Sequence, residues 1–233
     1  MLRHTDAHAF RKSVAGFSMV VAPLLFLASA ILSPRLTSDE ARQLAVVGGH
    51  ADRWYASNAL GLLSLLVLVP AILGLMHMLR ERQAGLGHLG GALALVGAML
   101  SALGTGVALV IWQMAAASAD PRAMTALYER LTGTAGVSVP LVAGGFVLAA
   151  GLLVLCAGLV RAQAVHGSAA LVLAAGAVLF AVGGATFSTS VLVVAAAASL
   201  IGLGSIGLQV LSETTDAWEH TPEQHGFTPL AGH

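Results

Sequence analysis

The chain has 233 residues, of which 57% are hydrophobic and only 9% are charged, and its mean hydropathy is +0.86. A soluble domain of this length needs far more charge to cover its surface. Eleven basic residues balance eleven acidic ones, so the net charge gives no electrostatic basis for binding nucleic acid. Cys156 is the only cysteine, which excludes a disulfide within the chain and a cysteine-ligated metal site.

Long apolar stretches predict an all-α fold, a bundle of six transmembrane helices. A bilayer core about 30 Å thick requires about 20 helical residues. Charged residues separate the first four stretches, but Ala162 to Ser212 contains no Asp, Glu, Lys or Arg. As one helix it would be on the order of 75 Å long, more than twice the membrane thickness, so we place a turn at the polar segment Thr186 to Ser190. The predicted spans cover residues 14–32, 56–79, 88–112, 136–160, 167–186 and 191–211.

These spans form one transmembrane domain, residues 1–212, and residues 213–233 are predicted to be a disordered cytoplasmic tail. The positive-inside rule favours both termini on the inner side, because the basic residues there adjoin the span ends. The inner residues are Arg3, Arg11, Lys12, Arg80, Arg82 and Arg161, against Arg35, Arg42, Arg53, Arg122 and Arg130 outside. A cleavable signal peptide is the alternative for the first span, since Ala28-Ser29-Ala30 resembles a cleavage site.

Two longer loops are each predicted to carry a short amphipathic helix on the outer face. In the first loop, Thr37 and Glu40 match a capping box. In the second, Asp120 is suited to the N-cap and Pro121 to the first helical position. The apolar faces comprise Leu44 and Val47 in the first helix and Met124, Leu127, Tyr128 and Leu131 in the second. We interpret both helices as structural covers over the span ends, with a substrate lid as the alternative.

The order span, outer helix, span, inner hinge occurs twice, and a third pair of spans lacks the outer helix. This is a repeat of organisation, because few positions match when the chain is shifted by one unit. Glycine-containing pairs along the spans predict close helix packing, against either the bundle or a second subunit. These pairs are Gly87/Gly91, Gly97/Ser101, Gly145/Ala149 and Gly202/Ile206.

His77 and His88 lie on either side of the charged hinge between the second and third spans. Paired histidines on neighbouring helices can hold a b-type haem, and imidazole also binds zinc or copper. However, the predicted spans contain no Asp or Glu that could support a metal ligand. We therefore interpret both residues as an interfacial polar corner, and keep a cofactor site formed by His77 and His88 as the alternative.

The other polar residues of the spans are hydroxyl and amide side chains, which more often make interhelical hydrogen bonds than a permeation path. A carrier coupled to protons through a buried carboxylate is therefore not expected. Sequence motifs for hydrolase, metalloprotease or nucleotide-binding sites are also lacking. The polar residues are Asn58, Ser64, Ser101, Thr105, Gln113, Ser138, Ser199, Ser205 and Gln209. In the tail, His220, His225 and His233 with nearby acids could bind a metal only loosely.

The segment RWYASNALGLLSLLVLVPAILGLMHMLR, the capped loop before it and the Ala/Gly/Leu-rich spans resemble uncharacterised six-span membrane proteins of bacteria, particularly actinobacteria. The resemblance implies a multi-pass protein of the plasma membrane but no site residue. We expect a non-catalytic accessory subunit or a binder of an apolar ligand, with the lipid bilayer and either a second copy or a membrane subunit as partners. No cofactor is expected. The alternatives are a haem b electron-transfer protein using His77 and His88, and an uncoupled transporter of a small molecule or lipid.

Overall fold

The computed structural model describes residues 4–115, 120–215 and 218, and within these ranges it contains eight α-helices and no strand. Six are long and apolar enough to cross a membrane, which confirms the six-span helical bundle. The long helices are α1 (His4–Leu32), α3 (Ala51–Leu79), α4 (Ala84–Met114), α6 (Ala135–Arg161), α7 (Gly167–Ala185) and α8 (Thr189–Ser212). The two short helices are α2 (Glu40–Gly49) and α5 (Pro121–Gly133).

The helices end within two residues of the predicted span ends, but α1, α3 and α4 begin earlier than predicted, at His4, Ala51 and Ala84. Hydropathy locates only the apolar part of a helix, whereas backbone hydrogen bonds continue into polar segments such as Asp52-Arg53. The predicted turn between the fifth and sixth spans is confirmed. Phe187 adopts a left-handed conformation there (φ 51°), and Ser188 accepts a hydrogen bond from the Val191 amide as the N-cap of α8.

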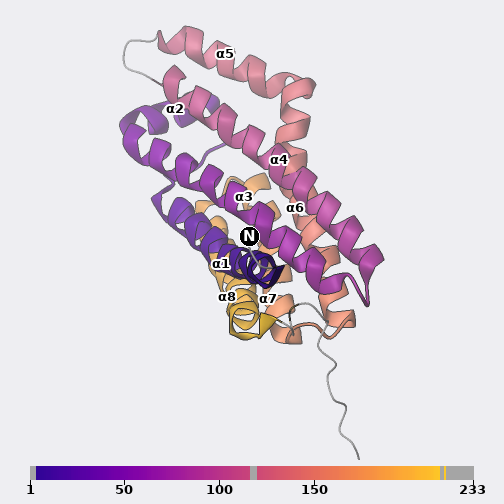
Figure 1. The fold of residues 1–233 in the computed structure, drawn as a ribbon. Helices are drawn as coiled ribbons and strands as arrows, with labels where there is room; N and C mark the ends of the chain where they lie inside the picture. Colours follow the sequence, from indigo (N-terminus) through magenta and orange to yellow (C-terminus); the bar gives the residue numbers. More distant parts are fainter. Residues whose placement is uncertain (1–3, 116–119, 216–217, 219–233) are drawn as a thin grey trace, which may run out of the picture.

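The six long helices form a closed ring of three hairpins, α1/α3, α4/α6 and α7/α8 (Figure 1). Contacts between α3 and α4, between α6 and α7, and between α8 and α1 join the hairpins. Helices α2 and α5 lie together at one end, which we call the outer-helix end; loops 80–83 and 162–166 lie at the opposite hinge end. The predicted repeat of span, outer helix and span is therefore present as two of the three hairpins.

The N-terminus of α2 differs from the predicted capping box. Asp39, not Thr37, is the N-cap, and its carboxylate accepts a hydrogen bond from the Arg42 amide at 2.8 Å. The Thr37 hydroxyl instead accepts from the Asp39 amide, one turn before the helix. Thr37 and Asp39 are both suitable N-cap residues, and the helix begins at Glu40, directly after Asp39. Asp120 and Pro121 occupy the predicted positions at the start of α5.

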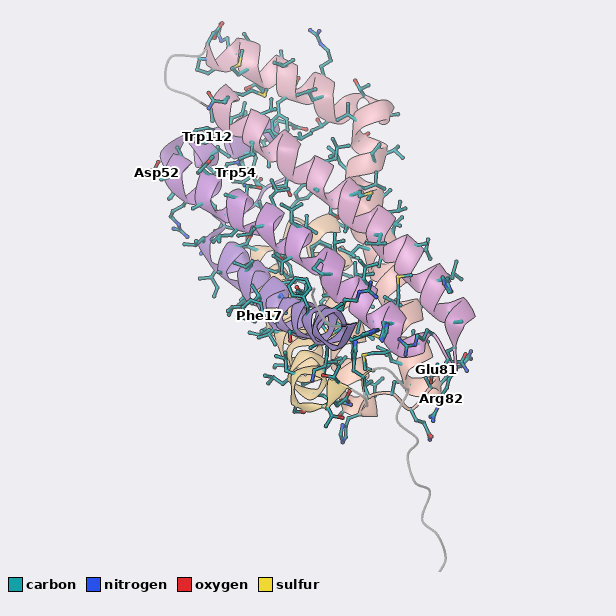
Figure 2. All side chains as sticks on the ribbon, viewed as in Figure 1. Phe17, Asp52, Trp54, Glu81, Arg82 and Trp112 are labelled. Carbon is teal, nitrogen blue, oxygen red and sulfur yellow. The ribbon has the colours of Figure 1, made fainter. Side chains whose placement is uncertain are left out.

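A small apolar cluster fixes the outer helices to the bundle. It consists of Leu44, Val47, Trp54, Ile111 and Met114, with Met124, Tyr128 and Leu131 of α5 packed against it. The Trp54 indole nitrogen donates to the Ala108 carbonyl at 2.8 Å, and Trp112 lies with Trp54 at this end of the bundle (Figure 2). The predicted faces are confirmed except at Leu127, which is 38% exposed. The outer helices therefore cover one end of α3 and α4.

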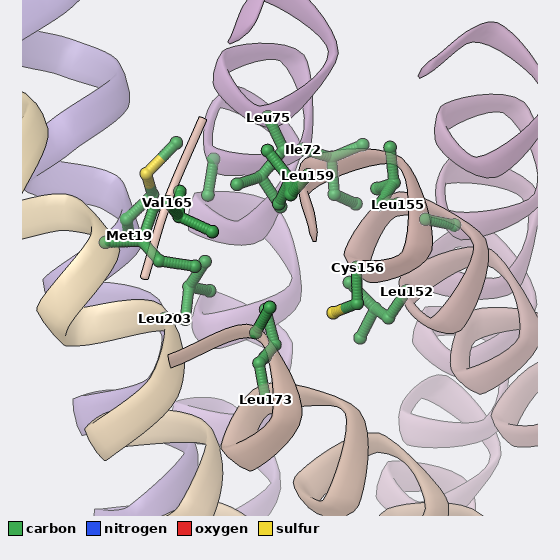
Figure 3. Packing of buried hydrophobic residues seen from close by; sticks show 14 of the residues in the cluster. Met19, Ile72, Leu75, Leu152, Leu155, Cys156, Leu159, Val165, Leu173 and Leu203 are labelled. Carbon is green, nitrogen blue, oxygen red and sulfur yellow. The ribbon is translucent and has the colours of Figure 1, made fainter. Parts of the chain in front are cut away.

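The hinge half of the ring is filled by large apolar side chains from every span (Figure 3). Met19, Ile72, Leu75, Leu155 and Leu159 are at most 1% exposed. By contrast, large apolar side chains such as Phe17 and Leu66 are 64% and 60% exposed on the outside of the bundle. Large apolar side chains exposed on the outside of a helical bundle are typical of a protein surrounded by lipid.

Glycines allow the hairpin helices to approach each other with backbones nearly in contact. A Cβ atom at Gly151 of α6 would overlap the backbone of Ala94 in α4, and one at Gly202 of α8 would overlap the backbone of Leu173 in α7. The predicted positions Gly87, Gly91 and Gly97 also face neighbouring spans. These stripes therefore face the bundle. Gly145 is looser, since a Cβ there would lie 3.7 Å from the Phe180 ring.

The start of the predicted disordered tail is instead fastened to the bundle. Trp218 is 6% exposed and belongs to the apolar core of the hinge half. The Lys12 ammonium donates to the Glu213 carbonyl, and the Gln209 amide donates to the Glu213 carboxylate at 3.1 Å. These contacts are not expected of a disordered segment, whereas the disorder predicted for residues 213–233 as a whole stays a prediction. Residues 216–217 and 219–233, with the three tail histidines, lie outside the described residues.

Candidate functional site

His77 lies near the hinge end of α3, half-buried beneath the indole of Trp218. The two rings stack with centroids 4.7 Å apart and planes inclined by 17°. Arg80 Nη1 lies 2.9 Å from His77 Nδ1 and 2.5 Å from His77 Nε2, and the Trp218 carbonyl oxygen lies 3.2 Å from Nε2. Both ring nitrogens therefore have protein partners, and one face of the imidazole is covered.

His88 lies in the first turns of α4, and its side chain is exposed. Its Nδ1 donates to the Ala84 carbonyl at 2.7 Å, four residues earlier in the same helix. A haem bound between the two histidines would have to displace Trp218 and Arg80 from His77. The cofactor alternative therefore stays a prediction that these contacts do not favour, and the polar corner is the simpler description of both residues.

The structure assembles a different candidate site inside the ring. A cavity of about 210 Å³ is lined by residues of all six spans. The apolar part of its lining includes Phe26, Leu65, Ala177 and Phe180, and the rings of Phe26 and Phe180 meet edge to face at 5.3 Å. Six helices in a ring leave a central space that side chains must fill, and here small residues such as Ala22 and Gly61 leave part of it open.

The cavity lies in the middle and the outer-helix half of the ring. Leu152, Leu173 and Leu203 are the lining residues of α6, α7 and α8 that lie nearest the hinge end, so they form its floor. Beyond the floor, Leu75, Leu159 and Ile206 are at most 1% exposed. Within the described residues, the interior is therefore packed between the cavity and the hinge end.

The polar part of the lining consists of hydroxyl and amide side chains: Ser29, Asn58, Ser64, Ser101, Thr105 and Ser199. Several of them have partners on neighbouring or preceding turns. The Ser29 hydroxyl donates to the Ser57 carbonyl at 2.8 Å, and the Ser64 hydroxyl donates to the Ala22 carbonyl at 2.7 Å. These two bonds join α1 to α3, as the sequence predicts for hydroxyl side chains in spans. They also hold the wall of the cavity in one geometry.

Ser101 differs from Ser29 and Ser64. Its Oγ atom is buried and has no hydrogen-bond partner. One turn later, the Thr105 hydroxyl donates to the Ser101 carbonyl at 3.2 Å. A serine within a helix usually donates to the carbonyl four residues before it, but Ser101 does not make this bond. An unpaired buried hydroxyl costs about 1–3 kcal/mol, so this position favours any occupant that supplies an acceptor.

The lining contains no Asp, Glu, Lys, Arg or His among the described residues, and no group of three potential metal ligands occurs in this part of the chain. A charged molecule placed in such a site would lose its hydration without gaining a counter-charge. The chemistry that the cavity offers is therefore shape, apolar contact and neutral hydrogen bonding.

The sequence contained the elements of this site but not their arrangement. Asn58, Ser64, Ser101, Thr105 and Ser199 are all among the polar span residues noted above, where we interpreted them only as helix-packing contacts. That interpretation is confirmed for Ser64. The sequence did indicate that several small or polar residues lie near the middle of their spans. Whether these residues face one another can be predicted only when the order of the helices around the ring is known.

Comparisons of the chain with protein families, with curated proteins and with solved structures found no match. The resemblance to six-span bacterial membrane proteins thus stays a prediction from amino-acid composition and the order of the spans.

Proposed function

We propose that this multi-pass membrane protein is a non-catalytic binder that holds an apolar ligand in the cavity between its six spans, in the plasma membrane of a bacterium. The observation that carries the proposal is a cavity lined by all six spans and closed toward the hinge end by Leu152, Leu173 and Leu203. Ligand sites in membrane bundles lie between helices, and apolar lining with a few polar groups is the usual composition of such sites.

A binding role is favoured over an uncoupled carrier by the packing of the hinge half. Passage would require movement of Leu75, Leu159 and Ile206, which are at most 1% exposed. The close backbone contacts at Gly151 and Gly202 hold the helices that carry this packing. No specific observation favours electron transfer, because the described contacts of His77 and His88 are with protein groups. A second copy or another membrane subunit as partner stays a prediction.

Native mass spectrometry of the protein purified in mild detergent tests the proposal. We expect the intact protein to retain a small apolar molecule at no more than one copy per chain. The Ala177→Phe variant should lose it, because Ala177 is 2% exposed and lines the cavity. Val178→Phe is the matched control, since Val178 is the next residue of α7 and is 45% exposed on the outside.

A second pair of variants tests the same proposal in case Ala177→Phe does not fold. Leu65→Phe fills the cavity from α3, and Leu66→Phe alters the 60% exposed neighbour. Elution as a single species and an unchanged helical circular dichroism spectrum establish folding. The proposal would be contradicted if the cavity-filling variants and their controls retained the small molecule equally. It would also be contradicted if the unmodified protein carried no bound molecule.

A further inference from the structure

The charge-free lining restricts the ligand to a neutral molecule. Fatty-acid anions, amines and phosphate-bearing lipid headgroups each need a counter-charge or water in the site, and none of the described lining residues supplies one. A pure hydrocarbon would be accepted by the leucine floor but would leave the Ser101 hydroxyl without a partner. The lining therefore suits a molecule that is apolar over most of its surface and carries one uncharged polar atom.

The unpaired hydroxyl of Ser101 selects the type of polar atom. Its hydrogen makes no hydrogen bond to the protein, and its oxygen is buried among side chains of the wall. The neighbouring Thr105 hydroxyl is engaged with the Ser101 carbonyl, and the Asn58 amide nitrogen donates to the Trp54 carbonyl at 2.9 Å. Ser101 is thus a buried donor of the wall without a protein partner, and its natural complement is a carbonyl, ether or alcohol oxygen.

The volume restricts the size of the bound part. A cavity of about 150 Å³ holds a benzene molecule, whereas sites for complete drug-sized ligands begin at about 300 Å³. The present cavity, at about 210 Å³, lies between these values. It therefore encloses a small amphiphile, or the oxygen-bearing end of a longer one whose remaining chain lies outside.

We propose that the cavity binds the uncharged, oxygen-bearing end of a lipid-like alcohol, ketone or ester, and that Ser101 Oγ donates the hydrogen bond to that oxygen. This inference rests on the proposed ligand-binding function and adds the chemical class and the recognising residue. The apolar carbons that are enclosed together with this oxygen lie against Leu152, Leu173 and Leu203. A water molecule is the rival partner for Ser101, and it predicts no preference for oxygen-bearing ligands.

Photoaffinity labelling with four eight-carbon diazirine probes tests the proposal: an alcohol, a ketone, a hydrocarbon and a carboxylic acid. Purified protein in detergent is titrated with each probe at pH 9, where the acid is ionised, and labelled peptides are mapped by mass spectrometry. We expect saturable labelling of cavity-lining peptides by the alcohol and the ketone. The hydrocarbon should bind about 2- to 10-fold more weakly, which corresponds to one neutral hydrogen bond. The carboxylate should not label the cavity.

The Ser101→Ala variant should reduce the affinity for the alcohol and ketone to that for the hydrocarbon, while hydrocarbon labelling stays unchanged. Ser138→Ala is the matched control, because Ser138 does not line the cavity and its hydroxyl donates to the Thr134 carbonyl, four residues earlier. Equal labelling by hydrocarbon and alcohol in the unmodified protein, or strong labelling by the carboxylate, would overturn the assignment of ligand class while leaving cavity binding intact. An unchanged alcohol preference in Ser101→Ala would overturn the role of Ser101. No labelling of the cavity by any probe would instead overturn the proposed function.

Discussion

The pKa of Tyr128 depends on whether the outer helix α5 is docked against the bundle. It packs from α5 against the apolar cluster beneath α2, and its pKa is raised above the ordinary value of 10.0. Burial is the larger cause, because it disfavours the charged phenolate, and the nearby Glu40 carboxylate adds repulsion. Since the folded-state pKa is the higher one, this contribution to stability is complete below pH 10 and is lost as the pH rises through the folded-state pKa.

We therefore predict that Tyr128 ionises only above pH 10 in the folded protein. Absorbance at 295 nm as a function of pH measures this directly in a Tyr55→Phe variant, which leaves Tyr128 as the only tyrosine. Glu40→Gln in the same background should lower the Tyr128 pKa only in part, because burial is the larger cause. Titration of Tyr128 at or below pH 10 would show that α5 is not docked as described.

Residue-scale contacts were the hardest to predict from sequence. The stacking of His77 on Trp218 joins residues 141 positions apart, and neither helix periodicity nor composition links them. The same applies to Ser101: its presence in a span was evident, but the lack of a partner depends on how α4 and α6 pack at this level. The capping error at Thr37 was of a different kind, since the sequence offered two suitable residues and local propensity alone did not rank them.

At the scale of helices, the sequence predicted the elements well because lipid imposes a simple requirement. Every backbone polar group in the hydrocarbon must be satisfied within its own helix, so long apolar stretches convert directly into spans. The turn at Thr186–Ser190 followed from length alone. The neighbours of each span were not predictable, because a glycine permits close packing on its own side of a helix without indicating which helix lies there.

Gly151 and Gly106 provide a matched test of the packing between α4 and α6. A Cβ at Gly151 would collide with the Ala94 backbone, whereas one at Gly106 meets nothing within 4 Å. We expect Gly151→Ala to lower the free energy of unfolding by about 1–3 kcal/mol. Gly106→Ala should leave it unchanged or raise it by up to about 1 kcal/mol, because alanine has the higher helix propensity.

Reversible unfolding of both variants in mixed micelles, followed by circular dichroism, measures the two changes in free energy. Equal stability of Gly151→Ala and Gly106→Ala would mean that α4 and α6 do not approach as closely as described.

At the scale of the whole molecule, three hairpins close into a ring, and the ring creates the cavity. Each hairpin is held by glycine contacts, and the outer helices cover one end of the first two. The sequence predicted the hairpins and their repeat, but the closure of the ring by α8 against α1 was not visible in it. The cavity could not be predicted for the same reason, since its walls come from all six spans. The orientation with both termini inside rests on the positive-inside rule and stays a prediction.

A density map of the protein in lipid nanodiscs, without added ligand, tests the central claim most directly. We predict a discrete density inside the ring, above the floor formed by Leu152, Leu173 and Leu203 and within hydrogen-bonding distance of Ser101 Oγ. The hinge half should be filled by Leu75, Leu159 and Ile206 without a channel. A ring in which Phe26 and Phe180 occupy the central space, or a continuous opening through the hinge half, would contradict the account.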